Sequence, residues 1–276
     1  MTRIWIVGCL VAGLSSVALA AGEVVFEDDF EADQARAEWS HRTTERAPNG
    51  HRRFLGRFCD EEVRLKIADL PRHDFIRITI DLLIIQTWDG AGRLSRAGRP
   101  IGPDVWQMAV EGGPLLVRNT FSNINFGADF LADDAKLQSY PSPLSGERHP
   151  ATTGAFETGK MGYTWQYQDN VKRVLDSAYR VSAIFPHRGE EVELVFKGDG
   201  LQSVDDESWG LDNVKVEAFG ADELERPTPR QMAPLWEIAA GGDPERARSA
   251  FWTLVLGGDS TVEFLRTAAR PGGADA

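Results

Sequence analysis

The chain has 276 residues, with 42 acidic and 30 basic side chains and a net charge of −12 at pH 7. An acidic balance of this size argues against binding to nucleic acid or to anionic membrane surfaces, because both are polyanions. Two cysteines, Cys9 and Cys59, are too few for a disulfide-stapled scaffold. The fold must therefore be held by a hydrophobic core, with or without a metal ion.

The first twenty residues have the features of a signal peptide. Arg3 precedes an apolar stretch from Ile4 to Val17, and Ala18-Leu19-Ala20 fits the small-x-small pattern of a signal peptidase site. The apolar run is shorter than the ~20 residues of a membrane span. We expect residues 1–20 to be removed and the protein to be exported to the periplasm, the cell surface or the medium. Cys59 would then remain as an inert, buried thiol.

Residues 23–219 have the two-residue periodicity of β-strands. Apolar side chains alternate with polar ones along Val63–Ile67, Ile76–Leu82 and Val192–Phe196. One apolar face per strand suits a sheet that packs on a second sheet. We expect a mainly β fold, a two-layer antiparallel β-sandwich of the jelly-roll type, in which the first strand pairs with the last.

The periodicity changes after a linker at residues 220–233. Residues 234–270 predict a helical segment, in which Ala247, Ala250, Phe251 and Leu254 fall on one helical face. Helices this short do not bury an apolar stripe by themselves. We expect them to dock on the sandwich, on a second copy of the chain or on another helical unit.

Ordered motifs along residues 23–219 resemble a known class of module. The motifs are Phe54-Leu55-Gly56-Arg57-Phe58, Leu70-Pro71-Arg72-His73, Ile84-Ile85-Gln86-Thr87-Trp88-Asp89-Gly90, Gly102-Pro103-Asp104-Val105-Trp106, Thr120-Phe121-Ser122-Asn123, Phe185-Pro186-His187 and the run from Asp206 to Val216. In this order they resemble a jelly-roll module of the laminin-G/concanavalin-A-like kind from exported bacterial proteins. The resemblance implies glycan binding or adhesion. The C-terminal segment, with Pro234-Leu235-Trp236 and Ala250-Phe251-Trp252, is similar to a short HEAT-like helical segment.

Acidic residues at the two ends of the sandwich suggest a metal site. If the first and last strands pair, Asp29 or Glu31 approaches Asp212, which interrupts an apolar strand and needs a partner. Ca²⁺ prefers several carboxylate and carbonyl oxygens, and the resemblance implies a structural ion of this kind. The alternative is that Asp212 caps a turn and that the N-terminal acids are solvated.

Two tryptophans beside acids suggest a ligand site. Trp88-Asp89 and Asp104-Val105-Trp106 flank one long loop, and an aromatic face beside an Asp is a common arrangement for binding a sugar. An opposite wall would come from other aromatic residues, namely Tyr140, Tyr163, Trp165 and Tyr167. Two alternatives remain open. Trp88 and Trp106 belong to the core, or Asp89 and Asp104 hold a second Ca²⁺.

Catalytic motifs are few. Glu27, Asp29 and Glu31 have the Glu-x-Asp-x-Glu outline of retaining glycosidases, but Asp28 stands where an apolar residue is expected. The histidines show no metal-ligand spacing, and His73 and His187 each follow a proline, which indicates a role in turns.

Three hypotheses follow. The first is a non-catalytic module that binds a glycan or a surface component and is stabilised by Ca²⁺. The second is a scaffold that docks a protein partner through an exposed apolar stripe of the C-terminal helices, Trp252 included. The third is a retaining glycosidase that uses Glu27, Asp29 and Glu31.

Overall fold

The computed structural model describes residues 22–92, 98, 101–127, 133–142, 148–167, 169–241 and 244–268. The predicted signal peptide at residues 1–20 lies outside the described residues. No helix in the described part of the chain is long and apolar enough to cross a lipid bilayer.

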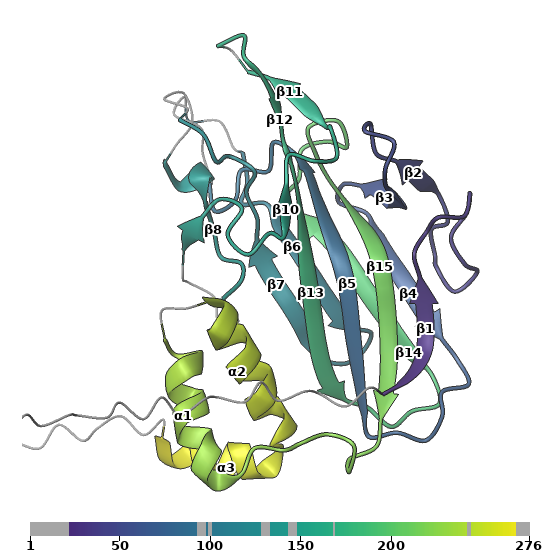
Figure 1. Cartoon of the computed structure of the whole chain (residues 1–276), viewed down its shortest axis with the longest axis vertical. Helices are drawn as coiled ribbons and strands as arrows, with labels where there is room; N and C mark the ends of the chain where they lie inside the picture. Colours follow the sequence, from purple (N-terminus) through teal and green to yellow (C-terminus); the bar gives the residue numbers. More distant parts are fainter. Residues whose placement is uncertain are drawn as a thin grey trace, which may run out of the picture.

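Two antiparallel sheets form the body of the protein (Figure 1). The larger sheet has the order β10 (Glu157–Thr158), β13 (Asp176–Pro186), β5 (Phe75–Gln86), β15 (Glu207–Phe219), β3 (Arg53–Phe58) and β2 (Thr44–Arg46), and β1 (Glu23–Asp28) also pairs with β15. The smaller sheet has the order β4 (Glu62–Ile67), β14 (Val192–Asp199), β6 (Val105–Val110) and β7 (Leu115–Thr120). The remaining short elements are η1 (Asp133–Lys136), β8 (Leu137–Gln138) with β9 (His149–Pro150), and β11 (Thr164–Gln166) with β12 (Lys172–Val174). The predicted mainly β, two-layer antiparallel sandwich followed by short helices is confirmed.

Strand β15 organises the larger sheet because it has three partners. Along one side it pairs with β5 over its whole length. Along the other side its first part pairs with β3, from Trp209 opposite Phe58 to Leu211 opposite Leu55. Its last part pairs with β1, from Val214 opposite Asp28 to Ala218 opposite Glu23. The prediction that the first and last strands pair is confirmed.

The core lies between the two sheets, on the faces where apolar residues alternate. Ile78, Ile80 and Leu82 of β5 face Leu194 and Phe196 of β14 in one buried cluster. Full burial of such a side chain stabilises the fold by roughly 1.5–3 kcal/mol. Cys59 is half-buried at the margin of this cluster, not buried as the sequence predicts. Partial burial, and then the charge of Asp60, raise the pKa of its thiol to about 11. The thiol is therefore protonated at neutral pH, which agrees with the inert role expected for it.

The helices are α1 (Pro229–Ala239), α2 (Pro244–Leu256) and α3 (Asp259–Ala268). Helix α1 begins at Pro229, inside the segment predicted to be a linker and before the predicted boundary at residue 234. The reason is local: Thr228 N donates 2.8 Å to Gln231 Oε1, and Pro229 occupies the first helical position. Both features favour a helix start.

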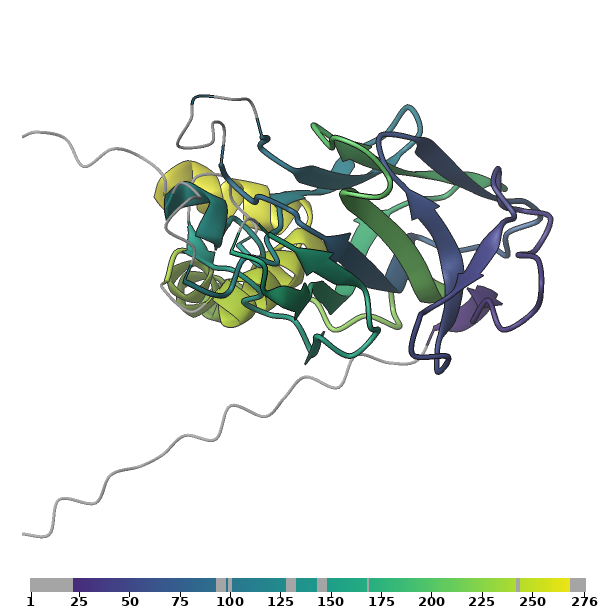
Figure 2. The ribbon, with the colours of Figure 1, turned by 90° about the horizontal axis from the view of Figure 1, so that it is seen from above.

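The helices gather at one side of the molecule, beside β13 (Figure 2). Leu256 of α2 packs with Phe75, Ile184 and Phe219 of the larger sheet, and Trp252 packs against the same cluster. Of the three docking modes expected, the helices adopt docking on the sandwich. The apolar stripe expected to receive a protein partner is therefore largely covered, because Trp252 contacts the sandwich itself.

Candidate metal centre

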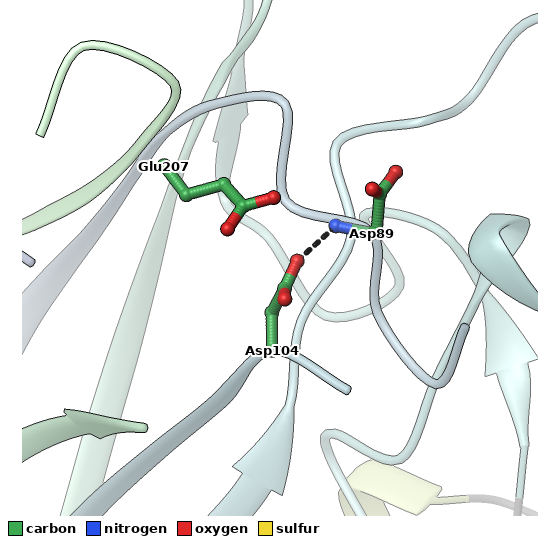
Figure 3. A group of neighbouring side chains, drawn as sticks. All are labelled: Asp89, Asp104 and Glu207. Atoms are coloured by element: carbon green, nitrogen blue, oxygen red, sulfur yellow. Dashed lines mark hydrogen bonds between the residues drawn. The ribbon is translucent and has the colours of Figure 1, made fainter. Parts of the chain in front are cut away.

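Three carboxylates meet at one end of the sandwich (Figure 3). Asp89 lies just after β5, Asp104 lies just before β6, and Glu207 is the first residue of β15. Since β5 and β15 are antiparallel, the last residue of one, Gln86, lies opposite the first residue of the other, Glu207. Strand β6 belongs to the other sheet, so the cluster joins the ends of strands from both layers. The ligand oxygens of the three residues all lie within 4.8 Å of one another.

The acid cluster, defined as Asp89, Asp104 and Glu207, is buried. The exposed fractions of the three residues are 7%, 0% and 0% respectively. No described basic side chain forms an ion pair with any of them. Among the described residues, no other group of three or more acidic, histidine or cysteine side chains is this compact. Buried carboxylates without a counter-charge need either protons or a cation.

Burial is the main cause of the electrostatic behaviour of the acid cluster. Burial first, and the charges of neighbouring acids second, raise the pKa of Asp89 to about 7 and that of Glu207 to about 9. The pKa of Asp104 is also raised, first by burial and then by the charges of Glu207 and Asp89. Without a cation, the acid cluster therefore holds protons at neutral pH.

The hydrogen bonds of the acid cluster leave oxygens available. Glu207 accepts two bonds from Gln202, from the backbone N at 2.8 Å and from Nε2 at 3.0 Å. Asp104 Oδ2 accepts the backbone N–H of Asp89, whereas the buried Asp104 Oδ1 has no hydrogen-bond partner. Next to this oxygen is Gly102, where a Cβ would lie 2.8 Å from Asp104 Oδ1 and 2.7 Å from the Gly92 carbonyl oxygen. A side chain at position 102 would thus clash with both of these oxygens, so only glycine fits beside Asp104.

This donor set fits a hard divalent cation. Ca²⁺ binds carboxylate and backbone carbonyl oxygens, six to eight at a time, and here three carboxylates, one with an unsatisfied oxygen, meet in a buried site. Nitrogen and sulfur ligands, which zinc and copper prefer, are not among the three residues. The sequence alternative in which Asp89 and Asp104 share an ion thus has a geometric basis. The third member, Glu207, was missed, although the acidic pair Asp206-Glu207 at the entrance of an otherwise apolar strand was a signal.

The predicted metal set Asp29, Glu31 and Asp212 is not brought together as a compact group. Although β1 pairs with β15, the strand ends at Asp28, and Asp29 and Glu31 lie beyond it in exposed positions. Asp29 Oδ1 accepts a bond from Glu31 N at 3.2 Å. The Asp212 carboxylate instead forms an ion pair with Arg52, with Nε 3.3 Å from Oδ2. A guanidinium thus supplies the counter-charge that was expected from Ca²⁺.

Trp88 and Trp106 are not at a binding rim. Both are completely buried in the main core. Trp88 Nε1 donates 2.8 Å to the Ser208 carbonyl oxygen, and the Trp106 ring lies 6.3 Å from that of Trp209. Neither ring is accessible to a sugar, so the core alternative is correct for both. The expected ligand set of Trp88, Asp89, Asp104 and Trp106 is therefore wrong for the tryptophans. Its two acids belong to the acid cluster.

The aromatic residues expected to form an opposite wall are dispersed. Tyr140 and Tyr163 are buried in two separate clusters. Trp165 lies on β11, and the Tyr167 ring packs 5.5 Å from that of Phe126. The acid cluster raises the pKa of Tyr167, after the larger effect of burial, so this ring lies near the candidate metal centre.

The three acids predicted to form a glycosidase site do not lie along one strand. Only Glu27 lies within β1, and Phe30 has a φ of 53°, in the left-handed region. The alternation that would align Glu27, Asp29 and Glu31 on one face is broken at this point.

The structure also brings two histidines together that the sequence pattern assigns to separate turns. The ring centroids of His73 and His187 are 5.0 Å apart.

Comparison with known proteins finds only distant structural similarity. No protein-family model and no curated protein sequence matches the chain. Among solved structures, the chain is similar to the carbohydrate-binding module CBM6cm-2 of Cellvibrio mixtus lichenase 5A in complex with cellotriose, at 10% identity and a TM-score of 0.30, over 70% of this chain and 97% of that one. It is also similar to the Agl-KA catalytic domain, at 14% identity and a TM-score of 0.36, over 92% of this chain and 36% of that one. Similarity this low assigns neither a ligand nor an activity.

Proposed function

We propose that the protein is an exported, non-catalytic β-sandwich that binds carbohydrate and is stabilised by Ca²⁺ at Asp89, Asp104 and Glu207. The observation that supports this most is the burial of three carboxylates within 4.8 Å of one another. With the ion bound, all three residues are ionised and act as its ligands. Because they come from the ends of β5, β6 and β15, the ion cross-links the two sheets.

The carbohydrate part of the proposal depends on a surface groove rather than on the tryptophans. A groove with a volume of about 480 Å³ lies between the outer face of β13 and helix α2. Tyr140 and the half-exposed Phe156 contribute to its wall. A volume of this order suits a small ligand, and an aromatic ring at a groove suits the apolar face of a sugar ring. The export part is supported by the sequence around Ala18-Leu19-Ala20.

Thermal melting with Ca²⁺ and with a chelator tests the ion. A free Ca²⁺ concentration of 100 times Kd stabilises the native state by about 2.7 kcal/mol, and we expect the Tm to rise accordingly. Asp104→Asn should lose this rise. Asp33→Asn is the matched control, because the Asp33 side chain is 95% exposed and far from the acid cluster in the sequence; it should keep the rise. Wild-type melting curves that coincide with and without Ca²⁺ would eliminate the ion.

A separate measurement tests carbohydrate binding. The Ca²⁺-loaded protein is titrated with neutral and acidic oligosaccharides by calorimetry, and we expect reversible binding of at least one class with no release of reducing sugar. If no oligosaccharide binds, the carbohydrate proposal fails while the ion remains. Release of reducing sugar would overturn the non-catalytic part.

A further inference from the structure

The groove between β13 and α2 differs in charge from the protein as a whole. The protein carries a net charge of −12, but the described residues that line the groove include three arginines, Arg77, Arg180 and Arg248, and no Asp or Glu. Two of them come from the larger sheet and the third comes from α2, so the guanidinium groups approach the groove from both sides. Guanidinium groups on a concave surface are suited to receive an anion.

Two of these arginines already have acidic partners. Arg180 forms two bonds to Asp81, at 2.8 and 3.0 Å, across the β13–β5 pair. Arg77 Nη2 lies 2.8 Å from Glu217 Oε2 across the β5–β15 pair. Their positive charges are therefore compensated within the sheet. They can still donate further hydrogen bonds, because a guanidinium has five N–H groups.

Arg248 has no such partner. It forms no hydrogen bond or ion pair with another described residue, and its buried Nη2 atom has no hydrogen-bond partner at all. Its one defined contact is with an aromatic ring: Cζ lies 5.1 Å from the centroid of Tyr140. Burial lowers the pKa of this guanidinium from its usual value, which is the effect of removing a cation from water without a counter-charge.

A second unsatisfied donor lies one helical turn from Arg248. The Nε1 atom of Trp252 is buried and has no hydrogen-bond partner, and both residues line the groove. Residues four positions apart project from the same face of a helix. Helix α2 therefore presents two unpaired donors to one concave surface. An unsatisfied buried donor destabilises the protein, and a ligand with acceptor oxygens would satisfy both of these donors.

We propose that this groove binds the carboxylate of an acidic saccharide, a uronic acid unit, with Arg248 as the residue that receives the carboxylate. The inference depends on the proposed carbohydrate-binding function and narrows it to one class of ligand. A guanidinium and a carboxylate match each other in shape and form two parallel hydrogen bonds. Phe156, which is 50% exposed, supplies an aromatic ring for the apolar side of the pyranose.

The donors in the groove favour an acidic over a neutral sugar. Neutral sugars have hydroxyl groups that donate as well as accept, and proteins bind them with Asp, Glu, Asn or Gln side chains beside the aromatic ring. The described lining has none of these four residue types. Its polar side chains are three arginines, a tryptophan, a tyrosine, a serine and a threonine, a set rich in donors. A ligand rich in acceptors, such as a carboxylate, complements it.

Calorimetric titration at low salt tests the proposal, with trigalacturonic acid as the acidic probe and a neutral trisaccharide as its counterpart. We expect the wild-type protein to bind the acidic probe and to bind the neutral one at least tenfold more weakly. Arg248→Met, which keeps most of the apolar stem, should weaken binding of the acidic probe about tenfold or more. Arg266→Met is the matched control, because Arg266 lies on α3 and its side chain is 73% exposed; it should leave the affinity unchanged.

A melting experiment separates a binding role from a structural one. If Arg248 serves binding, Arg248→Met removes an uncompensated buried charge, and the Tm of the free protein should stay equal or rise. The acidic probe should raise the Tm of the wild type and not that of Arg248→Met. A fall in Tm on substitution, with equal affinities of wild type and variant for trigalacturonic acid, would overturn the proposal. Tight binding of the neutral trisaccharide that Arg248→Met does not affect would also overturn it, but would leave the carbohydrate-binding function standing.

Discussion

His73 Nε2 and His187 Nδ1 lie 2.7 Å apart, and the planes of the two rings are nearly parallel, with an angle of 9° between them. His73 Nδ1 also lies 2.6 Å from the Pro71 carbonyl oxygen. A carbonyl oxygen only accepts, so His73 Nδ1 carries the proton, and Nε2 of the neutral ring accepts from His187 Nδ1. The pair therefore joins the entrance of β5 to the end of β13 while both rings are neutral.

The first prediction is that acid weakens this junction. Burial, and then the proximity of His73, lower the pKa of His187. The folded pKa is below the unfolded one, so the stabilisation is complete above the ordinary histidine pKa of about 6.5 and is lost as the pH falls through the lowered value. Urea unfolding at several pH values between 7.5 and 5 should show stability falling more steeply in the wild type than in His187→Gln. Parallel pH profiles would contradict the assignment.

The second prediction concerns the acid cluster without Ca²⁺. The folded pKa values of Asp89 and Glu207, about 7 and about 9, lie above the ordinary carboxyl range. Their favourable contribution is therefore complete below a pH of about 4 and is lost as the pH rises through 7 and 9. In chelator, the wild type should lose stability between pH 5 and pH 9, and Glu207→Gln should lose less.

Addition of Ca²⁺ should reverse this pH dependence, because the ion binds the ionised carboxylates and competes with protons. The stabilisation by Ca²⁺ should therefore grow with pH in the wild type and be absent from Glu207→Gln. The measurement is the urea midpoint at each pH, with and without the ion. A Ca²⁺ effect that does not vary with pH would show that the ion binds elsewhere.

The third prediction is that Trp106 stabilises the fold and does not contact the ligand. Trp106 is completely buried between Phe196 and Trp209. Trp106→Ala should destabilise the protein by roughly 3–5 kcal/mol, through lost burial and the cavity that remains. Trp106→Phe should cost less and leave ligand affinity unchanged. Chemical denaturation and calorimetry on the same samples check both outcomes. Weaker binding by a stably folded Trp106→Phe would argue for a direct role in binding.

The fourth prediction concerns Asp176 at the start of β13. Its carboxylate accepts four backbone N–H groups, at 2.9–3.1 Å: those of Lys160, Met161, Gly162 and Tyr163. In Asp176→Asn an amide group would face two of these donors, and leaving them unsatisfied should destabilise the protein by about 2–4 kcal/mol. Hydrogen exchange should speed up at residues 160–163 in particular.

Asp169→Asn is the control for Asp176. Asp169 pairs with Arg173 at 2.6 Å, and its side chain is 33% exposed. An ion pair at the surface contributes about 0–1 kcal/mol, so this variant should stay close to the wild type. Equal destabilisation by the two variants would mean that the four backbone contacts of Asp176 contribute little.

The strands were predictable because their signal is local. In β14 the buried residues Val192, Leu194 and Phe196 alternate with half-exposed ones, as the sequence pattern indicated. The long run of β5 is apolar at both faces near its end, since a second buried cluster contains Leu83 and Ile85. Period and composition are enough to infer such strands.

The sites were less predictable because they depend on which strand ends meet. Asp212 is separated from Arg52 by more than half of the chain, and nothing in either local sequence indicates their ion pair. Glu207 joins Asp89 and Asp104 only because β15 and β6 begin at the same end of the sandwich as the end of β5. The tryptophans were misassigned for a related reason. The sequence pattern around a tryptophan at a strand end is the same whether the ring is exposed for binding or buried in the core.

The pairing of β1 with β15 has a consequence for how the chain reaches its native state. Glu23 lies opposite Ala218, so a nascent chain holds its first strand without a partner until almost the whole sandwich has been synthesised. Contacts of such long sequence separation form late and slow the acquisition of the native fold. During that interval the edge of β1 is open to pairing with other chains. A chaperone that protects this segment would therefore act before the last strand arrives.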